Sequence, residues 1–461
     1  MTARSGTPAA TPAGNSAGPV GTRSLWAGKR LYVAIFLFFN LFINYMDRIN
    51  LSIAAPAIAK EFAWNPGTMG LIFSAFIWSY CFCIIPWGWM SDRIGTRQVS
   101  GFSVTIWSIG AMLTGAATGL GSMLAARLAL GVGEAASVPA SGKVVRQWFP
   151  PGERGLATAI FNAGTFAGPA VSAPAIAWLV LKAGWRISFI VAGAMGIAWV
   201  LLWLKLFRVP SECSWLPIEE RAYILEETGG QTTVAPPPKG AVVRLIRTKT
   251  MWGLLLTEGC CAYTMLMFLF WLPSYLVQTR HMDLMKASWF TAVPYLVAAV
   301  MGLFVGRLSD SLLTEEAVRQ GKRRSLLIVF ILLSTSVLLT NVVRNEYLVL
   351  LLISLSLSFI GTAVTLNIAL SSDLVWNPNM VGTAMGISIL GGISFGMVAP
   401  IVTGYIVKWT GSFDGAFYVA GRLLFVGALI SFTMTRKPIH FDEESQSDER
   451  SGIDAQSLQI G

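Results

Sequence analysis

The sequence predicts an all-α membrane protein with twelve transmembrane helices, arranged as two six-helix halves. Hydrophobic residues make up 54% of the 461 positions and charged residues only 13%, whereas soluble domains carry about 25% charged residues. Apolar runs of roughly 20 residues, the length that spans a bilayer, follow one another along most of the chain. Short motifs from the first half also reappear in the second half.

Twelve apolar runs separated by short connections define the expected helices. They cover residues 31–52, 68–91, 98–118, 121–143, 156–181, 185–207, 251–278, 287–307, 323–343, 346–372, 380–408 and 413–435. We therefore expect a disordered N-terminal tail (1–28), an N-terminal six-helix half (29–207), a cytoplasmic linker (208–250), a C-terminal six-helix half (251–435) and a cytoplasmic C-terminal tail (436–461). Within the linker, PIEERAYILEETGG predicts a short helix between a proline and a glycine.

The repeats indicate that the two halves are related. GWMSD, which ends at Asp92, reappears as GRLSD, which ends at Asp310, and each follows the second span of its half. WRISFIVAG near the last span of the first half likewise matches FDGAFYVAG near the last span of the second. A duplicated six-span unit implies two parallel halves with a binding site between them.

The net charge of +10 is explained by basic residues concentrated in alternate connections. This pattern predicts a multi-pass protein of the plasma (inner) membrane with both termini cytoplasmic, and it makes a nucleic-acid partner unnecessary. The five cysteines and two histidines match no metal-binding spacing. There is no HExxH motif and no nucleotide-binding loop. We expect a monomer in the lipid bilayer that is not an enzyme and needs no metal or cofactor.

The stretch NLFINYMDRINLS (40–52) places polar side chains in an apolar run. Asn40, Asn44 and Asp47 are spaced at i, i+4 and i+7, so they share one helix face, and Arg48 lies beside them. Charges at membrane depth are costly and persist mainly where they pair or face a polar cavity. The alternative is that Asp47 and Arg48 snorkel to the interface from the end of the helix.

The fourth span carries a second charged face. Arg127, Gly131 and Glu134 follow the same i, i+4, i+7 spacing, and Gly131 with Gly133 allows a neighbouring helix to approach closely. A buried acid that can be neutralised is what proton coupling requires. The alternative is a structural ion pair that holds two helices together.

The loop GWMSDRIGTR resembles the signature loop of the major facilitator superfamily, and the second copy keeps only its first part. The resemblance implies the major facilitator fold and a gating role, in which Asp92 pairs with basic groups across the bundle when the inner side is closed. The gating residues implied are Gly88, Asp92, Arg93, Gly95, Arg97 and Asp310.

Longer stretches are similar to the anion:cation symporter family of that superfamily. They are NYMDRINLS, SAFIWSYCFCIIPWGWMSDRIG, RLALGVGEA and WFPPGERGLATAIFNAG, which together cover most of the first half, with patches in the second. This family includes bacterial hexuronate, galactonate and glucarate permeases and vesicular glutamate and lysosomal sialic acid carriers.

The resemblance assigns roles to individual residues. It implies that Asp47 and Glu134 are the proton-coupling acids and that Arg48 and Arg127 attract the substrate carboxylate, which a guanidinium can bind through two hydrogen bonds. The seventh span is expected to break near Pro273. The other substrate-binding candidates are Asn44, Tyr45, Tyr80, Thr165, Tyr263, Asn367 and Ser371.

Some positions depart from the family pattern. Ile84 and Ile85 stand where many members have a glutamine, and Ile393 stands about where sugar-acid carriers often have an asparagine. A less polar cavity leaves room for aromatic or smaller carboxylates beside sugar acids.

The sequence thus predicts proton-coupled symport of a small monovalent organic anion, such as a hexuronate or aldonate, by alternating access. An organic-anion exchanger or exporter would use the same residues, and a non-transporting sensor of organic acids is a further alternative. We also expect that the second half has no comparable charge within its spans, so that protons are handled by the first half.

Overall fold

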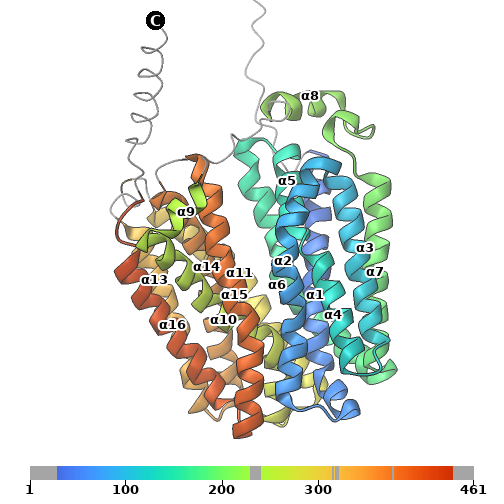
Figure 1. Cartoon of the computed structure of the whole chain (residues 1–461), viewed down its shortest axis with the longest axis vertical. Coiled ribbons are helices and arrows are strands. Elements are labelled where there is room, and N and C mark those ends of the chain that lie inside the picture. The colour runs from blue at the N-terminus through green and yellow to red at the C-terminus, as the bar shows by residue number, and fades with distance from the viewer. Residues whose placement is uncertain (1–27, 229–239, 314–315, 317–320, 376–377, 440–461) are drawn as a thin grey trace, which may run out of the picture.

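The computed structural model describes residues 28–228, 240–313, 316, 321–375 and 378–439, without the side chains of 303, 305–312 and 378–379. Two bundles of long helices stand side by side (Figure 1). The first contains α1 (Leu31–Phe62), α2 (Pro66–Ile94), α3 (Thr96–Gly115), α4 (Leu120–Glu134), α5 (Ser137–Trp148), α6 (Arg154–Ala183) and α7 (Trp185–Leu206). The second contains α10 (Lys249–Gln278), α11 (Leu284–Leu312), α13 (Lys322–Ser334) with the 3₁₀ segment Thr335–Asn341, α14 (Glu346–Leu374), α15 (Pro378–Thr410) and α16 (Asp414–Met434).

These segments confirm the prediction of twelve spans. Ten helices in the described part of the chain are long and apolar enough to cross a membrane by length and composition alone. The other two spans differ for physical reasons. Helix α3 carries several serines and threonines, and the fourth span is divided between α4 and α5 at Ala135 and Ala136. In the stretch of chain that connects the two bundles, the short helices α8 (Ile218–Glu227) and α9 (Ala241–Ile246) lie at one end of the molecule, and α8 is the predicted linker helix.

Two helices differ from the prediction. Helix α1 continues to Phe62 through Pro56, ten residues beyond the expected end, so Asp47 lies near its middle. Helix α10 runs unbroken from Lys249 to Gln278 through Pro273, so the predicted break in the seventh span is wrong. Both prolines are accommodated because packed neighbouring helices compensate the backbone groups that a proline leaves free.

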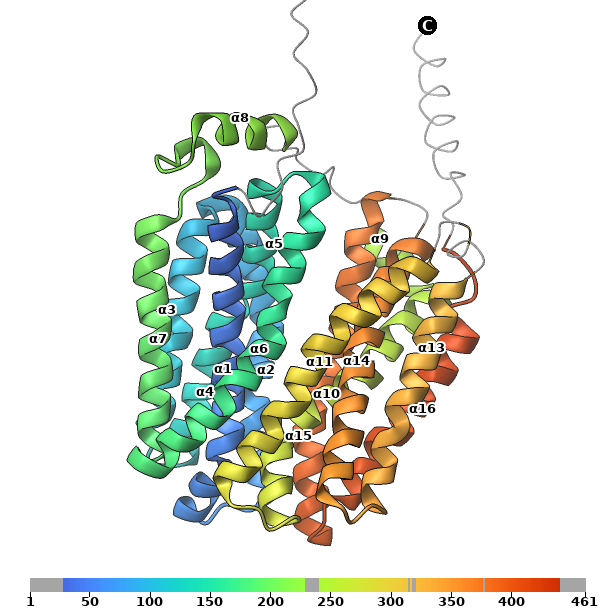
Figure 2. The same cartoon turned by 180° about the vertical axis from the view of Figure 1, so that it is seen from behind.

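The bundles contact each other closely at the end opposite α8, which we call the closed end. Figure 2 shows the bundles converging there and diverging towards α8 and α9. Ser52 of α1 donates a hydrogen bond across the bundles to the Phe270 carbonyl of α10 at 2.7 Å. Within the second bundle, the Trp271 indole donates to the Pro400 carbonyl at 3.1 Å. A Cβ atom on Gly70 would lie 2.5 Å from that same Pro400 oxygen, so only glycine permits this approach of α2 to α15.

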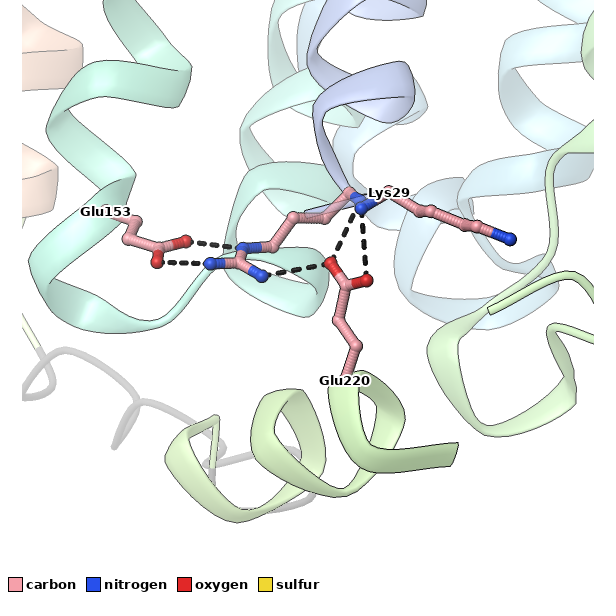
Figure 3. A network of polar contacts seen from close by, with 4 residues as sticks. Lys29, Glu153 and Glu220 are labelled. Carbon is pink, nitrogen blue, oxygen red and sulfur yellow. Dashed lines mark hydrogen bonds and ion pairs between the residues drawn. The ribbon is translucent and has the colours of Figure 1, made fainter. Parts of the chain in front are cut away.

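At the other end, a set of ionic contacts fixes α8 over the first bundle (Figure 3). The guanidinium of Arg30 donates to both oxygens of Glu153, at 2.7 and 2.6 Å, and to Glu220 of α8 at 2.9 Å. Glu220 also accepts from the backbone N–H groups of Lys29 and Arg30. Burial lowers the pKa of Arg30, but hydrogen bonds and charge from the two carboxylates outweigh it and raise that pKa above its usual value. The guanidinium therefore stays charged.

Candidate functional site

A cavity of about 370 Å³ lies between the two bundles, within the range typical of small-molecule sites. We call it the central cavity. Its wall is mostly apolar, with a few polar groups, as in sites where a small number of contacts orient a ligand. The polar lining residues are Tyr45, Arg48, Tyr80, Asn162, Thr165, Glu258 and Thr365, and the larger apolar ones are Phe76, Ile77, Phe166, Met265, Leu266, Val364, Ile368, Ile389 and Ile393.

Arg48 is the cation of this cavity. Its Nε and Nη2 atoms donate to Oε2 of Glu134 at 3.0 and 2.9 Å. The guanidinium also lies over the rings of Tyr45 (4.6 Å) and Phe76 (5.0 Å), with Tyr80 at 5.8 Å. Because both contacts to Glu134 go to one carboxylate oxygen and the side chain is 11% exposed, the guanidinium can still reach a ligand in the cavity.

Three further charged side chains lie behind Arg48. Asp47, Arg127 and Glu134 are 1%, 0% and 0% exposed, respectively. We call these residues with Arg48 the charge cluster. Asp47 is close enough to the other three charges to interact with all of them. The cluster thus holds two acidic side chains and two guanidinium groups.

The burial of the cluster decides one of the alternatives left open by the sequence. Asp47 is buried in the middle of α1, so the alternative that it snorkels to an interface is wrong. Glu134 pairs with Arg48 of α1 and makes no ion pair with Arg127 among the described residues. This ion pair joins α1 to α4, so the geometry fits a structural pair between two helices as well as a coupling site. The guanidinium of Arg127 makes no hydrogen bond to other described residues and lies 5.4 Å from the centre of the Phe76 ring. Such unsatisfied buried polar groups need an explanation, and function is a frequent one.

Close helix packing places the cluster. A Cβ atom on Gly131 would lie 2.0 Å from the Phe76 carbonyl oxygen, and one on Gly133 would lie 2.5 Å from the backbone nitrogen of Trp107. The predicted role of these glycines in close approach is therefore confirmed. Helix α4 can sit directly against α2 and α3, which brings Arg127 and Glu134 towards α1.

Only some of the predicted binding residues reach the central cavity. Tyr45, Arg48, Tyr80 and Thr165 line it. The other candidates are buried away from the lining, because the spacing of residues does not fix how each helix is rotated in a bundle; they are Asn44, Arg127, Tyr263, Asn367 and Ser371. Ile393 lines the cavity and makes it less polar, as expected, whereas Ile84 and Ile85 do not line it.

Sequence reasoning missed Glu258, the most informative residue of the second bundle. It lies on α10, is 5% exposed and lines the central cavity. Asn367 of α14 donates to its Oε2 at 2.8 Å and to the Leu254 carbonyl at 3.0 Å. The expectation that the second half has no charge within its spans is therefore wrong. The signal was present, because Glu258 is the only acidic residue in the apolar run 251–278.

The predicted gating residues lie near the end of α2. Asp92 pairs with Lys143 of α5 at 2.9 Å, within the first bundle, so pairing across the bundles when this end closes stays a prediction. Arg93 lies 3.8 Å from the Trp89 ring centre, and Arg97 donates to the Leu204 carbonyl. Gly95 has a φ of +84° where α2 ends and α3 begins, and Gly88 is half-buried. The side chain of Asp310 lies outside the described residues.

The described residues include no group of three or more His, Cys, Asp or Glu side chains that could hold a metal ion. The ionisable side chains at the cavity wall are those of Arg48, which is paired with Glu134, and Glu258, together with the hydroxyl groups of Tyr45 and Tyr80.

Twelve membrane helices in two bundles, with charged residues facing a central cavity, define the class of secondary transporters. Residues 37–391 match the model of the Major Facilitator Superfamily, and the chain belongs to this family. It is a membrane transporter and not an enzyme, as the sequence predicted.

The relatives confirm the resemblance to the anion:cation symporter type. The chain is 31% identical over 411 residues to a D-galactonate transporter of Escherichia coli O6:H1, covering 87% of this chain and 95% of the relative. It is 32% identical over 410 residues to a probable galactarate/D-glucarate transporter of Escherichia coli K12, covering 85% of this chain and 90% of the relative. The fold matches a bacterial homologue of the human lysosomal transporter Spinster with a TM-score of 0.71 and 17% identity, over 88% of this chain and 97% of that one.

Proposed function

We propose that this protein is a proton-coupled symporter of a monovalent organic anion and works by alternating access. A sugar acid such as a hexuronate or an aldonate is the expected substrate, in keeping with the substrates named for its relatives. The observation that carries the proposal is the Arg48–Glu134 ion pair at the cavity wall, backed by buried Asp47 and Arg127.

Arg48 is the proposed site of the substrate carboxylate. The planar guanidinium can form two parallel hydrogen bonds with a carboxylate, and the rings of Tyr45 and Tyr80 hold it in place. Substrate hydroxyl groups then meet Asn162, Thr165 and the two tyrosine hydroxyls along the same wall.

Proton coupling follows from competition for Arg48. A substrate carboxylate on Arg48 replaces Glu134, which is fully buried and is then left without its ion-pair partner. An unpaired buried carboxylate is unfavourable, so Glu134 takes up a proton. Asp47 in the same cluster is the second proposed proton carrier. Loss of these protons restores the Arg48–Glu134 pair and releases the substrate; two protons per monoanion would move net positive charge inward.

The arrangement of the bundles supplies the proposed movement. The closed end is the extracellular side and the end with α8 is the cytoplasmic side, in a multi-pass protein of the cell membrane with both termini inside. The halves 29–207 and 251–435 rock about the central cavity, with the monomer as the functional unit. Asp92 and the loop around it then meet the second half when the cytoplasmic end closes.

Uptake by purified protein in liposomes tests this function. After a thermal-shift screen of sugar acids, aromatic acids and small carboxylates, the best radiolabelled ligand is offered under an inward proton gradient. We expect accumulation that a protonophore abolishes. Accumulation that follows only an opposing solute gradient would identify an exchanger, and binding without movement would identify a sensor.

A further inference from the structure

Glu258 and Arg48 place an acidic and a basic side chain at two points of the central cavity. Arg48 comes from α1 of the first bundle and Glu258 from α10 of the second, and both line the same cavity. A ligand held by its carboxylate at Arg48 therefore presents another part of its surface to Glu258.

Glu258 has no cationic partner among the described residues, but unlike Glu134 it lines the central cavity, where a ligand can reach its carboxyl group. No Lys, Arg or His nitrogen lies within 4.0 Å of its carboxylate among the residues that the structure describes, and Arg48 is paired with Glu134. The single hydrogen bond it receives comes from the neutral amide of Asn367 and goes to Oε2. The other oxygen, Oε1, accepts none from the described residues.

The glycine at position 392 leaves space beside this carboxylate. A Cβ atom there would lie 3.3 Å from Cγ of Glu258 and 3.9 Å from Oε1, and both residues line the cavity. A carboxylate at membrane depth that faces a cavity and lacks a cationic partner is functional far more often than structural. Its free acceptor oxygen needs a hydrogen-bond donor, and the ligand is the group that can provide one.

We propose that Glu258 is a specificity-determining residue that selects monocarboxylates with hydrogen-bond donors at the far end and rejects dicarboxylates. The inference rests on the proposed function, since it assumes an organic anion at Arg48. In its ionised form Glu258 accepts a hydrogen bond from a hydroxyl or ammonium group at the far end through Oε1, whereas it repels a second carboxylate in a site of low polarity. One relative is named for a monocarboxylate, D-galactonate, and another for the dicarboxylates galactarate and D-glucarate. With Glu258 at the cavity, we expect this chain to take monocarboxylates.

Pairs of ligands that differ only at the far end test the proposal. D-Galactonate and galactarate differ in a terminal CH₂OH against a carboxylate. The series 5-hydroxypentanoate, 5-aminopentanoate and glutarate presents a hydroxyl, an ammonium or a carboxylate on one chain. Affinities are measured by calorimetry on full-length protein in detergent. We expect wild type to bind the monocarboxylate of each series at least about tenfold more tightly than the dicarboxylate.

The variant Glu258→Gln keeps the size of the side chain and removes its charge. We expect its preference to fall to within about threefold, because the repulsion of the second carboxylate is gone. Glu258→Asp keeps the carboxylate on a shorter side chain and should keep the preference. Comparing the two variants separates the effect of the charge from that of side-chain size, and Glu258→Asp still tests the proposal if Glu258→Gln folds poorly. Glu346→Gln is the matched control, since it removes an acid from α14 that pairs with Lys286 outside the cavity. Comparing the affinities of 5-hydroxypentanoate and 5-aminopentanoate shows whether the site prefers a neutral hydrogen-bond donor or a cation at the far end of the ligand.

The outcomes separate the two hypotheses. Equal binding of mono- and dicarboxylates by wild type, or the same preference in wild type and Glu258→Gln, would overturn the role of Glu258 and leave the proposed function standing. If no organic acid of any class binds wild type, both proposals fail.

Discussion

The two bundles hold their charges in different ways. In the first bundle, Asp47, Arg48, Arg127 and Glu134 form a cluster in which an ion pair of 2.9 Å joins α1 to α4. In the second, Glu258 stands alone among the described cavity-lining residues and is held by the neutral amide of Asn367.

This difference suggests a division of labour. The charge cluster can exchange one ionic partner for another, because it contains two acids and two guanidinium groups within reach of one another. Glu258 has no such partner among the described residues, and its second oxygen is left for a ligand. The first bundle is thus suited to bind the anion and couple its transport to protons. The second bundle is suited to select substrates by the groups at the end away from the carboxylate.

The largest expected effect is that of Arg48→Ala, which removes the anion-binding pole. Uptake should fall at least about 100-fold, because the substrate loses its bidentate partner and Glu134 is left buried without a cation. Arg48→Lys is the matched variant: it keeps the charge but cannot bind two carboxylate oxygens side by side. Proteoliposome uptake measures both, with size-exclusion chromatography to verify folding. Substantial uptake by Arg48→Ala would place the anion elsewhere.

Glu134→Gln should separate binding from coupling. The amide cannot release a proton, so accumulation against a gradient should be lost while counterflow exchange of labelled substrate continues. Both assays use the same liposomes, with and without a proton gradient. Continued concentrative uptake by this variant would show that Glu134 is not a coupling residue.

A change at the closed end tests how the two bundles meet. Gly70→Ala places a methyl group 2.5 Å from the Pro400 oxygen, and overpacking of this kind costs about 1–3 kcal/mol. The described conformation should become less populated and uptake about three- to tenfold slower. Gly121→Ala is the control, because no atom lies within 4 Å of the added carbon. Energy transfer between fluorophores attached to the two bundles measures how much of the protein is in the described conformation. Equal effects of both variants would argue against the closed end as a rocking contact.

The smallest effect is expected for Asn367→Ala, which leaves Glu258 without its donor. The loss of one buried hydrogen bond to a carboxylate should lower the free energy of unfolding by about 1–3 kcal/mol. Concentrative uptake should persist, with weaker preference for monocarboxylates. Thermal unfolding measures the change in stability, and competition of uptake by galactarate measures the change in preference. Loss of proton-driven accumulation would instead assign coupling to the second bundle.

The sequence predicted much of the first bundle because its signals are periodic. The i, i+4, i+7 spacing placed Asp47 on a polar face, and the glycines after Arg127 marked the close approach of α4 to α2. The end of α1 was misplaced because Pro56 lies in a run that is still apolar, and the surrounding bundle supports the helix past it.

The second bundle was harder to predict because its polar residues are isolated. Tyr263 and Ser371 are buried away from the cavity, and no periodic pattern indicates the rotation of α10 or α14. Glu258 was visible as a lone acid in an apolar run. Its position at the cavity and its contact with Asn367, 109 residues further along the chain, depend on how α10 and α14 pack.

The division of labour between the bundles is tested most directly by comparing Glu134→Gln and Glu258→Gln in one proteoliposome experiment. The best monocarboxylate and its matched dicarboxylate are supplied under an inward proton gradient, and counterflow is measured in parallel. We predict that Glu134→Gln loses accumulation but keeps counterflow and preference, whereas Glu258→Gln keeps accumulation and loses preference. Loss of proton-driven accumulation in Glu258→Gln, or its retention in Glu134→Gln, would contradict this account.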